Sequence, residues 1–249
     1  MFGWFGKKSD AETIEKHAQR IANKRAQAPD RWDSIQALSQ LLAQSKKDKA
    51  ADRIASIVAA LLPRFGYYTD PTITDQEEKD LAFRVILEGG ADGVPAIRQY
   101  MKASESLTWP LKMLDRLLSP SDVTGELLAV LEPMDTEYQR DPQRKLQVLQ
   151  ALEERRDSRI GPAVSRFFED VNETARFHAV GAVLSQEDAE SHRELADKLL
   201  TGEESVRVKT RVLERFAERG WALTVARPTL EKAPPPGWVV SASGAPARR

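Results

Sequence analysis

The chain has 249 residues, a formal net charge of −1 and no cysteine. The absence of cysteine excludes disulfides, thiol catalysis and cysteine metal sites, and it fits a reducing cytosol. The near-neutral charge argues against a general nucleic-acid binder, because such proteins carry a basic excess. No apolar run approaches the roughly 20 residues of a membrane span, so we expect a cytoplasmic protein.

The first nine residues precede the first expected helix. Residues 1–8 read MFGWFGKK, which is aromatic and ends in two lysines. We interpret residues 1–9 as a flexible N-terminal segment. An alternative is a weak contact with a membrane surface, in which the aromatic side chains lie at the headgroup level and the lysines face anionic lipid.

Apolar side chains at helical spacing predict a succession of helices, and no segment alternates in the way a strand does. The expected helices cover residues 11–28, 32–43, 46–65, 75–88, 94–102, 107–118, 121–134 and 142–155. Gly66 ends the third helix, as glycine commonly does past a helix C-terminus. The irregular insert that follows, residues 67–74, reads YYTDPTIT.

Residues 157–186 form the clearest helical pair, and residues 187–200 and 205–220 form the last one. The second helix of the clearest pair is apolar round much of its circumference, so it must be covered on more than one side. A stack of hairpins provides that cover. We therefore expect the following side chains to be buried between neighbouring hairpins: Phe167, Phe168, Phe177, Leu184 and Leu213.

The hairpins recur at a nearly fixed interval. Arg144, Arg176 and Arg207 begin equivalent second helices and are 32 and 31 residues apart, which is typical of stacked helical hairpins. Residues 157–186 resemble a HEAT repeat, with an apolar-Pro-Ala-apolar run, an aspartate, a small residue before arginine, and spaced alanines. The resemblance implies an all-α fold, a right-handed α-solenoid of about six HEAT-like hairpins over residues 10–221.

The helical pattern stops after Trp221. Residues 222–249 include three consecutive prolines followed by Gly237 and Trp238, then small residues and two arginines. We predict that this tail is extended or disordered. Trp238 is either a docking motif in the polyproline mode or a side chain that packs on the helices of its own chain.

Catalytic motifs are absent: the chain has no Gly-rich phosphate loop, no HExxH, no GxSxG and no EF-hand loop. Among HEAT-repeat enzymes, the deoxyhypusine hydroxylases need His-Glu pairs, and the closest sequence here is His192-Arg193-Glu194. The bilin lyases also use HEAT-like repeats, but nothing in this sequence distinguishes a bilin-binding pocket from ordinary aromatic side chains of the core. We therefore expect no enzyme activity, no cofactor and no metal.

The HEAT-like alkylpurine DNA glycosylases remain the alternative, because their concave face carries tryptophans, an aspartate and arginines. Trp109 and Asp115 resemble part of that set. They are six positions apart, about 240° round a helix at 100° per residue, so they do not share a face.

The expected function is a scaffold that binds a protein partner through the concave face of its second helices. The arginine series has two interpretations: structural bonds to Asp141, Asp170 and Glu204, or partly free guanidiniums that grip carboxylates of a partner. Recognition residues are also expected in the insert, since loops on a rigid scaffold often carry recognition. The candidate contact residues are Arg144, Arg176, Arg207, Lys112, Arg116, Tyr67 and Tyr68.

Overall fold

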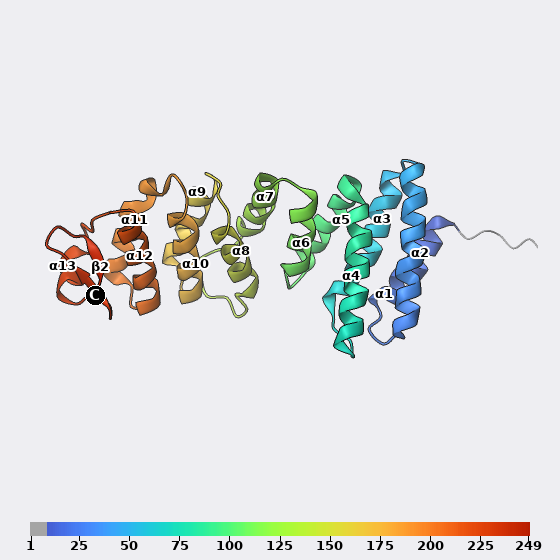
Figure 1. Cartoon of the computed structure of the whole chain (residues 1–249), viewed down its shortest axis with the longest axis horizontal. Helices are drawn as coiled ribbons and strands as arrows, with labels where there is room; N and C mark the ends of the chain where they lie inside the picture. Colours follow the sequence, from blue (N-terminus) through green and yellow to red (C-terminus); the bar gives the residue numbers. More distant parts are fainter. Residues whose placement is uncertain (1–8) are drawn as a thin grey trace, which may run out of the picture. The chain divides into compact units, whose positions relative to one another are not determined.

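The computed structural model describes residues 9–249, so residues 1–8, with their expected flexibility and membrane contact, lie outside the described part. The described chain is mostly helical, which confirms the all-α prediction (Figure 1). Ser9 caps the first helix rather than belonging to a flexible segment: its hydroxyl accepts a hydrogen bond from the Glu12 amide, and the Glu12 side chain accepts one from the Ser9 amide. The chain divides into two compact units, residues 1–119 and 120–249.

Unit 1 contains six α-helices in its described part. They are α1 (Asp10–Ala22), α2 (Ala28–Lys47), α3 (Ala51–Leu61), α4 (Thr72–Glu88), α5 (Gly90–Ala103) and α6 (Thr108–Leu117), with a 3₁₀ turn η1 (Leu62–Gly66) after α3. Contacts run from α1 to α3 to α5 in one row and from α2 to α4 to α6 in a second row. Each odd-numbered helix therefore pairs with the even-numbered helix that follows it, and the pairs stack side by side.

Unit 2 also consists of helix pairs, and the first helix of its middle pair has only five residues. Its elements are α7 (Pro120–Leu131), α8 (Gln143–Glu153), α9 (Ile160–Val164), η2 (Ser165–Glu169), α10 (Glu173–Leu184), η3 (Ala189–His192), α11 (Arg193–Gly202) and α12 (Val206–Glu218). The second helices α8, α10 and α12 pack in one row (Figure 1). We refer to α2, α4 and α6 of unit 1 and to α8, α10 and α12 of unit 2 as second helices.

The core of each unit lies between its two rows of helices. Leu38, Ile57 and Ile86 are fully buried in unit 1. In unit 2, four of the five predicted core residues are buried: Phe167, Phe168, Leu184 and Leu213. The prediction for Phe177 was wrong, because this side chain is only half-buried and two arginines of α12 cover its ring.

The C-terminal tail corrects the prediction of an extended or disordered segment with no strands. Residues 227–249 include α13 (Arg227–Lys232) and an antiparallel hairpin of β1 (Trp238–Val240) and β2 (Pro246–Arg248), which packs through β2 on α12. Trp238 is 2% exposed, so it packs on its own chain. Buried Asp197 of α11 accepts hydrogen bonds from the amides of Thr224, Val225 and Ala226, and these bonds fix the start of the tail.

Candidate partner-binding surfaces

Five ionisable side chains are buried together in unit 1, each at most 3% exposed: Arg31, Arg64, Asp75, Glu78 and Lys79. The Arg31 guanidinium donates two hydrogen bonds to Glu78, at 2.8 and 2.9 Å. Arg64 donates to Glu78 at 2.7 Å and to Asp75 at 2.7 Å, and Lys79 Nζ donates to Asp75 at 2.7 Å. The cluster links α2, η1 and α4, and its three cations and two carboxylates leave a net charge of +1.

This buried ion cluster holds the insert between η1 and α4. Asp75 Oδ1 accepts hydrogen bonds from the amide and the hydroxyl of Thr69, at 3.0 and 3.2 Å. Burial alone would raise the pKa of Asp75, but hydrogen bonds from Lys79 and Arg64 hold that pKa below its ordinary value. The Asp75 carboxylate is therefore kept ionised, and it holds the insert through Thr69.

The two tyrosines of the insert have different surroundings. Tyr67 turns inward: its hydroxyl donates to the carbonyl of Ile21, its ring lies 4.8 Å from the Arg64 guanidinium, and burial raises its pKa. Tyr68 is 84% exposed, with Lys79 Nζ 3.8 Å from its ring centroid. Ile73, in the first turn of α4, is 74% exposed. Of the two predicted contact residues, only Tyr68 is thus presented to solvent.

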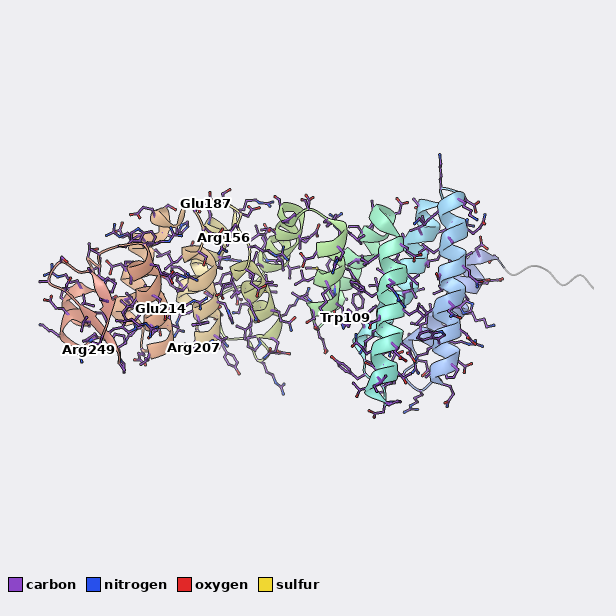
Figure 2. All side chains as sticks on the ribbon, viewed as in Figure 1. Trp109, Arg156, Glu187, Arg207, Glu214 and Arg249 are labelled. Atoms are coloured by element: carbon purple, nitrogen blue, oxygen red, sulfur yellow. The ribbon has the colours of Figure 1, made fainter. Side chains whose placement is uncertain are left out.

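Helix α6 carries the other predicted contact residues of unit 1. Trp109, which projects from the start of α6 (Figure 2), packs its ring 4.7 Å from Phe65 and 5.9 Å from Phe83. Lys112 is exposed and its Nζ lies 4.8 Å from the Trp109 centroid. Arg116 is exposed one turn further along. Because Phe65 lies in η1, directly before the insert, this aromatic cluster connects α6 to the segment that carries Tyr68.

Unit 2 contains a ladder of ion pairs between successive second helices. Lys145 in α8 bonds Asp170 at 2.6 Å, and Arg176 in α10 bonds Glu203 at 2.7 and 2.8 Å. Each carboxylate lies just before the next second helix and also accepts a hydrogen bond from an amide two residues on, that of Asn172 or Ser205. Hydrogen bonds from Arg176 and from the Ser205 amide outweigh burial and lower the pKa of Glu203.

The structure changes the membership of the predicted arginine series. Arg176 pairs with the Glu203 carboxylate and reaches Asp170 only at its backbone carbonyl, to which Nη1 donates. The first rung is Lys145, not Arg144, whose pKa is lowered by burial. The spacing contained this signal, because Lys145 lies 31 residues before Arg176, the same interval that separates Arg176 from Arg207.

Arg207 and Arg211 of α12 cover the ring of Phe177 in α10. Their guanidinium carbons lie 3.8 and 4.6 Å from its centroid. Arg207 also pairs with Glu173 at 3.2 Å, and Arg211 reaches across α10 to pair with Glu153 of α8. Arg207 projects from the beginning of α12 (Figure 2). These arginines are therefore paired within the chain, and the Arg207 side chain is also 50% exposed.

Arg211 crosses α10 at Gly181, where a Cβ atom would lie 2.6 Å from its Nη2 atom. The Glu153 carboxylate that receives it also lies 3.0 Å from His178 Nδ1. Burial lowers the pKa of His178, and the positive charge of Arg207 lowers it further. The sequence analysis missed this cluster, because its members become neighbours only when three second helices pack together.

No group of three or more His, Asp or Glu side chains within residues 9–249 is arranged to hold a metal ion. In the same residues, no helix combines the length and the apolar character that a membrane crossing requires. Comparison with protein-family models, curated proteins and solved structures finds no match to this chain. The assignment of function therefore depends on the surfaces described above.

Proposed function

We propose that this chain is a non-catalytic scaffold of the HEAT-repeat type, a right-handed α-solenoid of about six helical hairpins that binds a protein partner through the concave face of its second helices. The stacking of helix pairs in two rows in unit 1, and the row formed by α8, α10 and α12 in unit 2, support the repeat assignment. In this proposal, residues 10–221 form the array and the tail covers its last hairpin.

One observation carries the binding proposal: an exposed aromatic side chain is held on a buried ionic support. Burying five ionisable groups is costly, and well-packed apolar side chains of similar volume commonly give equal or greater stability. In this proposal, the ion cluster serves binding as well as stability, because it fixes the insert in a conformation that exposes Tyr68 to a partner. A pre-ordered tyrosine loses little conformational entropy on binding, which suits it to anchor an interface.

Tyr68 and Ile73 would supply the apolar contacts, and Lys112 and Arg116 the cationic contacts, of the unit 1 surface. The two cations are four residues apart on one face of α6 and neither belongs to the ion cluster. In this proposal, the ladder residues of unit 2, Arg176 with its partner Glu203, serve stability, so they are not expected to contact the partner.

The test begins by identifying the partner with a photo-crosslinking amino acid at position 68 in the full-length protein, followed by mass spectrometry. The purified partner is then titrated against wild type, Tyr68→Ala and Lys112→Glu/Arg116→Glu at two salt concentrations. We expect at least tenfold weaker binding by each variant with an unchanged melting temperature. Added salt should weaken binding by wild type more than by the double variant.

A matched control is Lys16→Glu/Arg20→Glu, which makes the same charge change at two exposed cations four residues apart on α1. Binding by this variant should equal that of wild type. Equal affinities for wild type, Tyr68→Ala and Lys112→Glu/Arg116→Glu would remove the unit 1 surface from the interface. Excision of an alkylated base by the purified protein would instead favour the glycosylase alternative.

A further inference from the structure

The most exposed large apolar side chains of unit 2 lie in the loops that precede its second helices or at the first residue of one of them. Tyr138 is 81% exposed and lies before α8, Val171 is 56% exposed and lies directly before the α10 N-cap, and Val206 is 52% exposed and begins α12. They are 33 and 35 residues apart, close to the repeat interval. The chain thus presents an apolar side chain at the start of each second helix in this unit.

These three positions lie on one continuous edge. We call residues 132–142, 169–174 and 202–207 the loop edge. The amide of Val171 donates to the carbonyl of Thr136 at 3.0 Å, which joins the first loop to the second. The Ser205 hydroxyl donates to Glu173 at 2.8 Å, which joins the second to the third. A pocket of about 340 Å³ lies beside Tyr138 and Val171, lined also by Glu137, Pro142 and Glu173.

The loop edge is strongly acidic. Its three loops contain nine Asp and Glu residues against two arginines, Arg140 and Arg207. The helix residues Lys145 and Arg176 neutralise two of the carboxylates through the ladder, and the Arg166 guanidinium donates to the Glu132 carbonyl, which leaves a net charge of −4. Carboxylates near helix N-termini stabilise the helices, but that effect gives no reason for exposed apolar side chains among them.

The spacing of the apolar side chains constrains the ligand. Packed helices lie roughly 8–10 Å apart, and α10 packs against both α8 and α12. A polyproline II segment repeats every three residues, over about 9 Å, with its backbone fully exposed for contact. An apolar side chain at every third residue of such a segment could therefore meet Tyr138, Val171 and Val206 in turn, with the intervening residues free to carry charge.

We propose that the loop edge is a second docking surface, which binds an extended peptide segment with an apolar side chain at every third residue and lysine or arginine between. The apolar side chains contact Tyr138, Val171 and Val206, and one enters the pocket between the first two. The cations of the segment face the unpaired excess of carboxylates. This surface is separate from the Tyr68 surface of unit 1, and its existence does not depend on the function proposed above.

The test uses a fluorescein-labelled synthetic peptide, (Leu-Pro-Lys)₄, and the full-length protein in a fluorescence anisotropy titration. Two matched peptides, (Ser-Pro-Lys)₄ and (Leu-Pro-Glu)₄, separate the apolar and the ionic contributions. We expect saturable binding of the first peptide, at least tenfold weaker binding of the second, and no binding of the third. The double variant Tyr138→Ser/Val171→Ser should bind (Leu-Pro-Lys)₄ at least tenfold more weakly with an unchanged melting temperature.

Val225→Ser is the control, because Val225 is 51% exposed in the same unit but lies outside the loop edge. Its affinity for (Leu-Pro-Lys)₄ should match that of wild type. The proposal is overturned if (Leu-Pro-Lys)₄ does not bind at millimolar protein, if the serine peptide binds equally well, or if the Tyr138→Ser/Val171→Ser variant retains full affinity. None of these results bears on partner binding at Tyr68, so the two proposals fail separately.

Discussion

Arg176 and Glu203 form a bidentate ion pair that joins α10 to the loop before α12, with N–O distances of 2.7 and 2.8 Å. The carboxylate is 1% exposed and the guanidinium 19%. One repeat earlier, Lys145 and Asp170 occupy the same positions, with both side chains at most 1% exposed. The same contact thus recurs between successive second helices of unit 2. Each of these ion pairs joins one helical hairpin to the next.

Removing Arg176 should destabilise the protein much more than removing Arg207. Arg176→Ala leaves the buried Glu203 carboxylate without its cation, so we expect a loss of about 3 kcal/mol in the free energy of unfolding. The Arg207–Glu173 pair is 50% and 35% exposed, so Arg207→Ala should cost about 1 kcal/mol, including its contact with Phe177. Urea unfolding measures both values. Equal losses would show that the buried ladder pair contributes no more to stability than the exposed Arg207–Glu173 pair.

Phe167 and Phe177 should differ in their contributions to stability. Phe167 is fully buried, so Phe167→Ala should cost about 3–5 kcal/mol through lost burial and the cavity left behind. Phe177 is half-buried beneath two guanidiniums that can settle into the vacated space, so Phe177→Ala should cost roughly 2 kcal/mol. The comparison is made by urea unfolding at one temperature. A loss for Phe177→Ala that equals that of Phe167→Ala would mean that the arginines do not relax.

The contribution of the unit 1 ion cluster to stability can be measured separately from that of Tyr68, the side chain that it holds outward. Glu78→Gln removes the carboxylate shared by Arg31 and Arg64 and leaves two buried guanidiniums, so we expect a loss of about 3–5 kcal/mol in the free energy of unfolding. Tyr68→Ala should change stability by less than about 1 kcal/mol, because the ring is largely exposed and its contact with Lys79 is a single cation–π pair. Thermal unfolding of both variants tests this division. A large loss in Tyr68→Ala would assign Tyr68 to the fold rather than to recognition.

Asp157 should give the protein a component of stability that depends on pH. Hydrogen bonds from Arg159 lower the pKa of Asp157 from 3.8 to about 2. Because the folded pKa lies below the unfolded pKa, this contribution is present above pH 4 and is lost as the pH falls through about 2. Asp157→Asn should therefore lower the urea midpoint at pH 6, and its difference from wild type should shrink between pH 4 and pH 2.

Arg159→Gln provides the check on that interpretation, since the Arg159 guanidinium is the main cause of the lowered pKa. The Asp157→Asn substitution should have less effect in the Arg159→Gln background than in wild type. A difference between Asp157→Asn and wild type that stays constant from pH 6 to pH 2 would show that the stabilisation does not come from the ionised carboxylate.

The sequence by itself determined the helical character of the chain and the places where many helices begin and end. The apolar periodicity of α10 and α12 is a local property. It depends on residues within a few positions of each other, so it can be recognised without knowing what packs against the helix. The burial of Phe167, Phe168, Leu184 and Leu213 followed from the same periodicity.

Only the tertiary structure decided which polar side chains meet. Arg31 and Glu78 are 47 residues apart, and their bond exists because α2 packs on α4. Phe177 lies on an apolar stretch of sequence, yet arginines from the next second helix cover it. The tail folds because Asp197, Trp238 and α12 give its backbone and side chains partners that its own proline-rich sequence lacks. Each outcome depends on contacts between distant segments, and the free energy of those contacts outweighs the local preference.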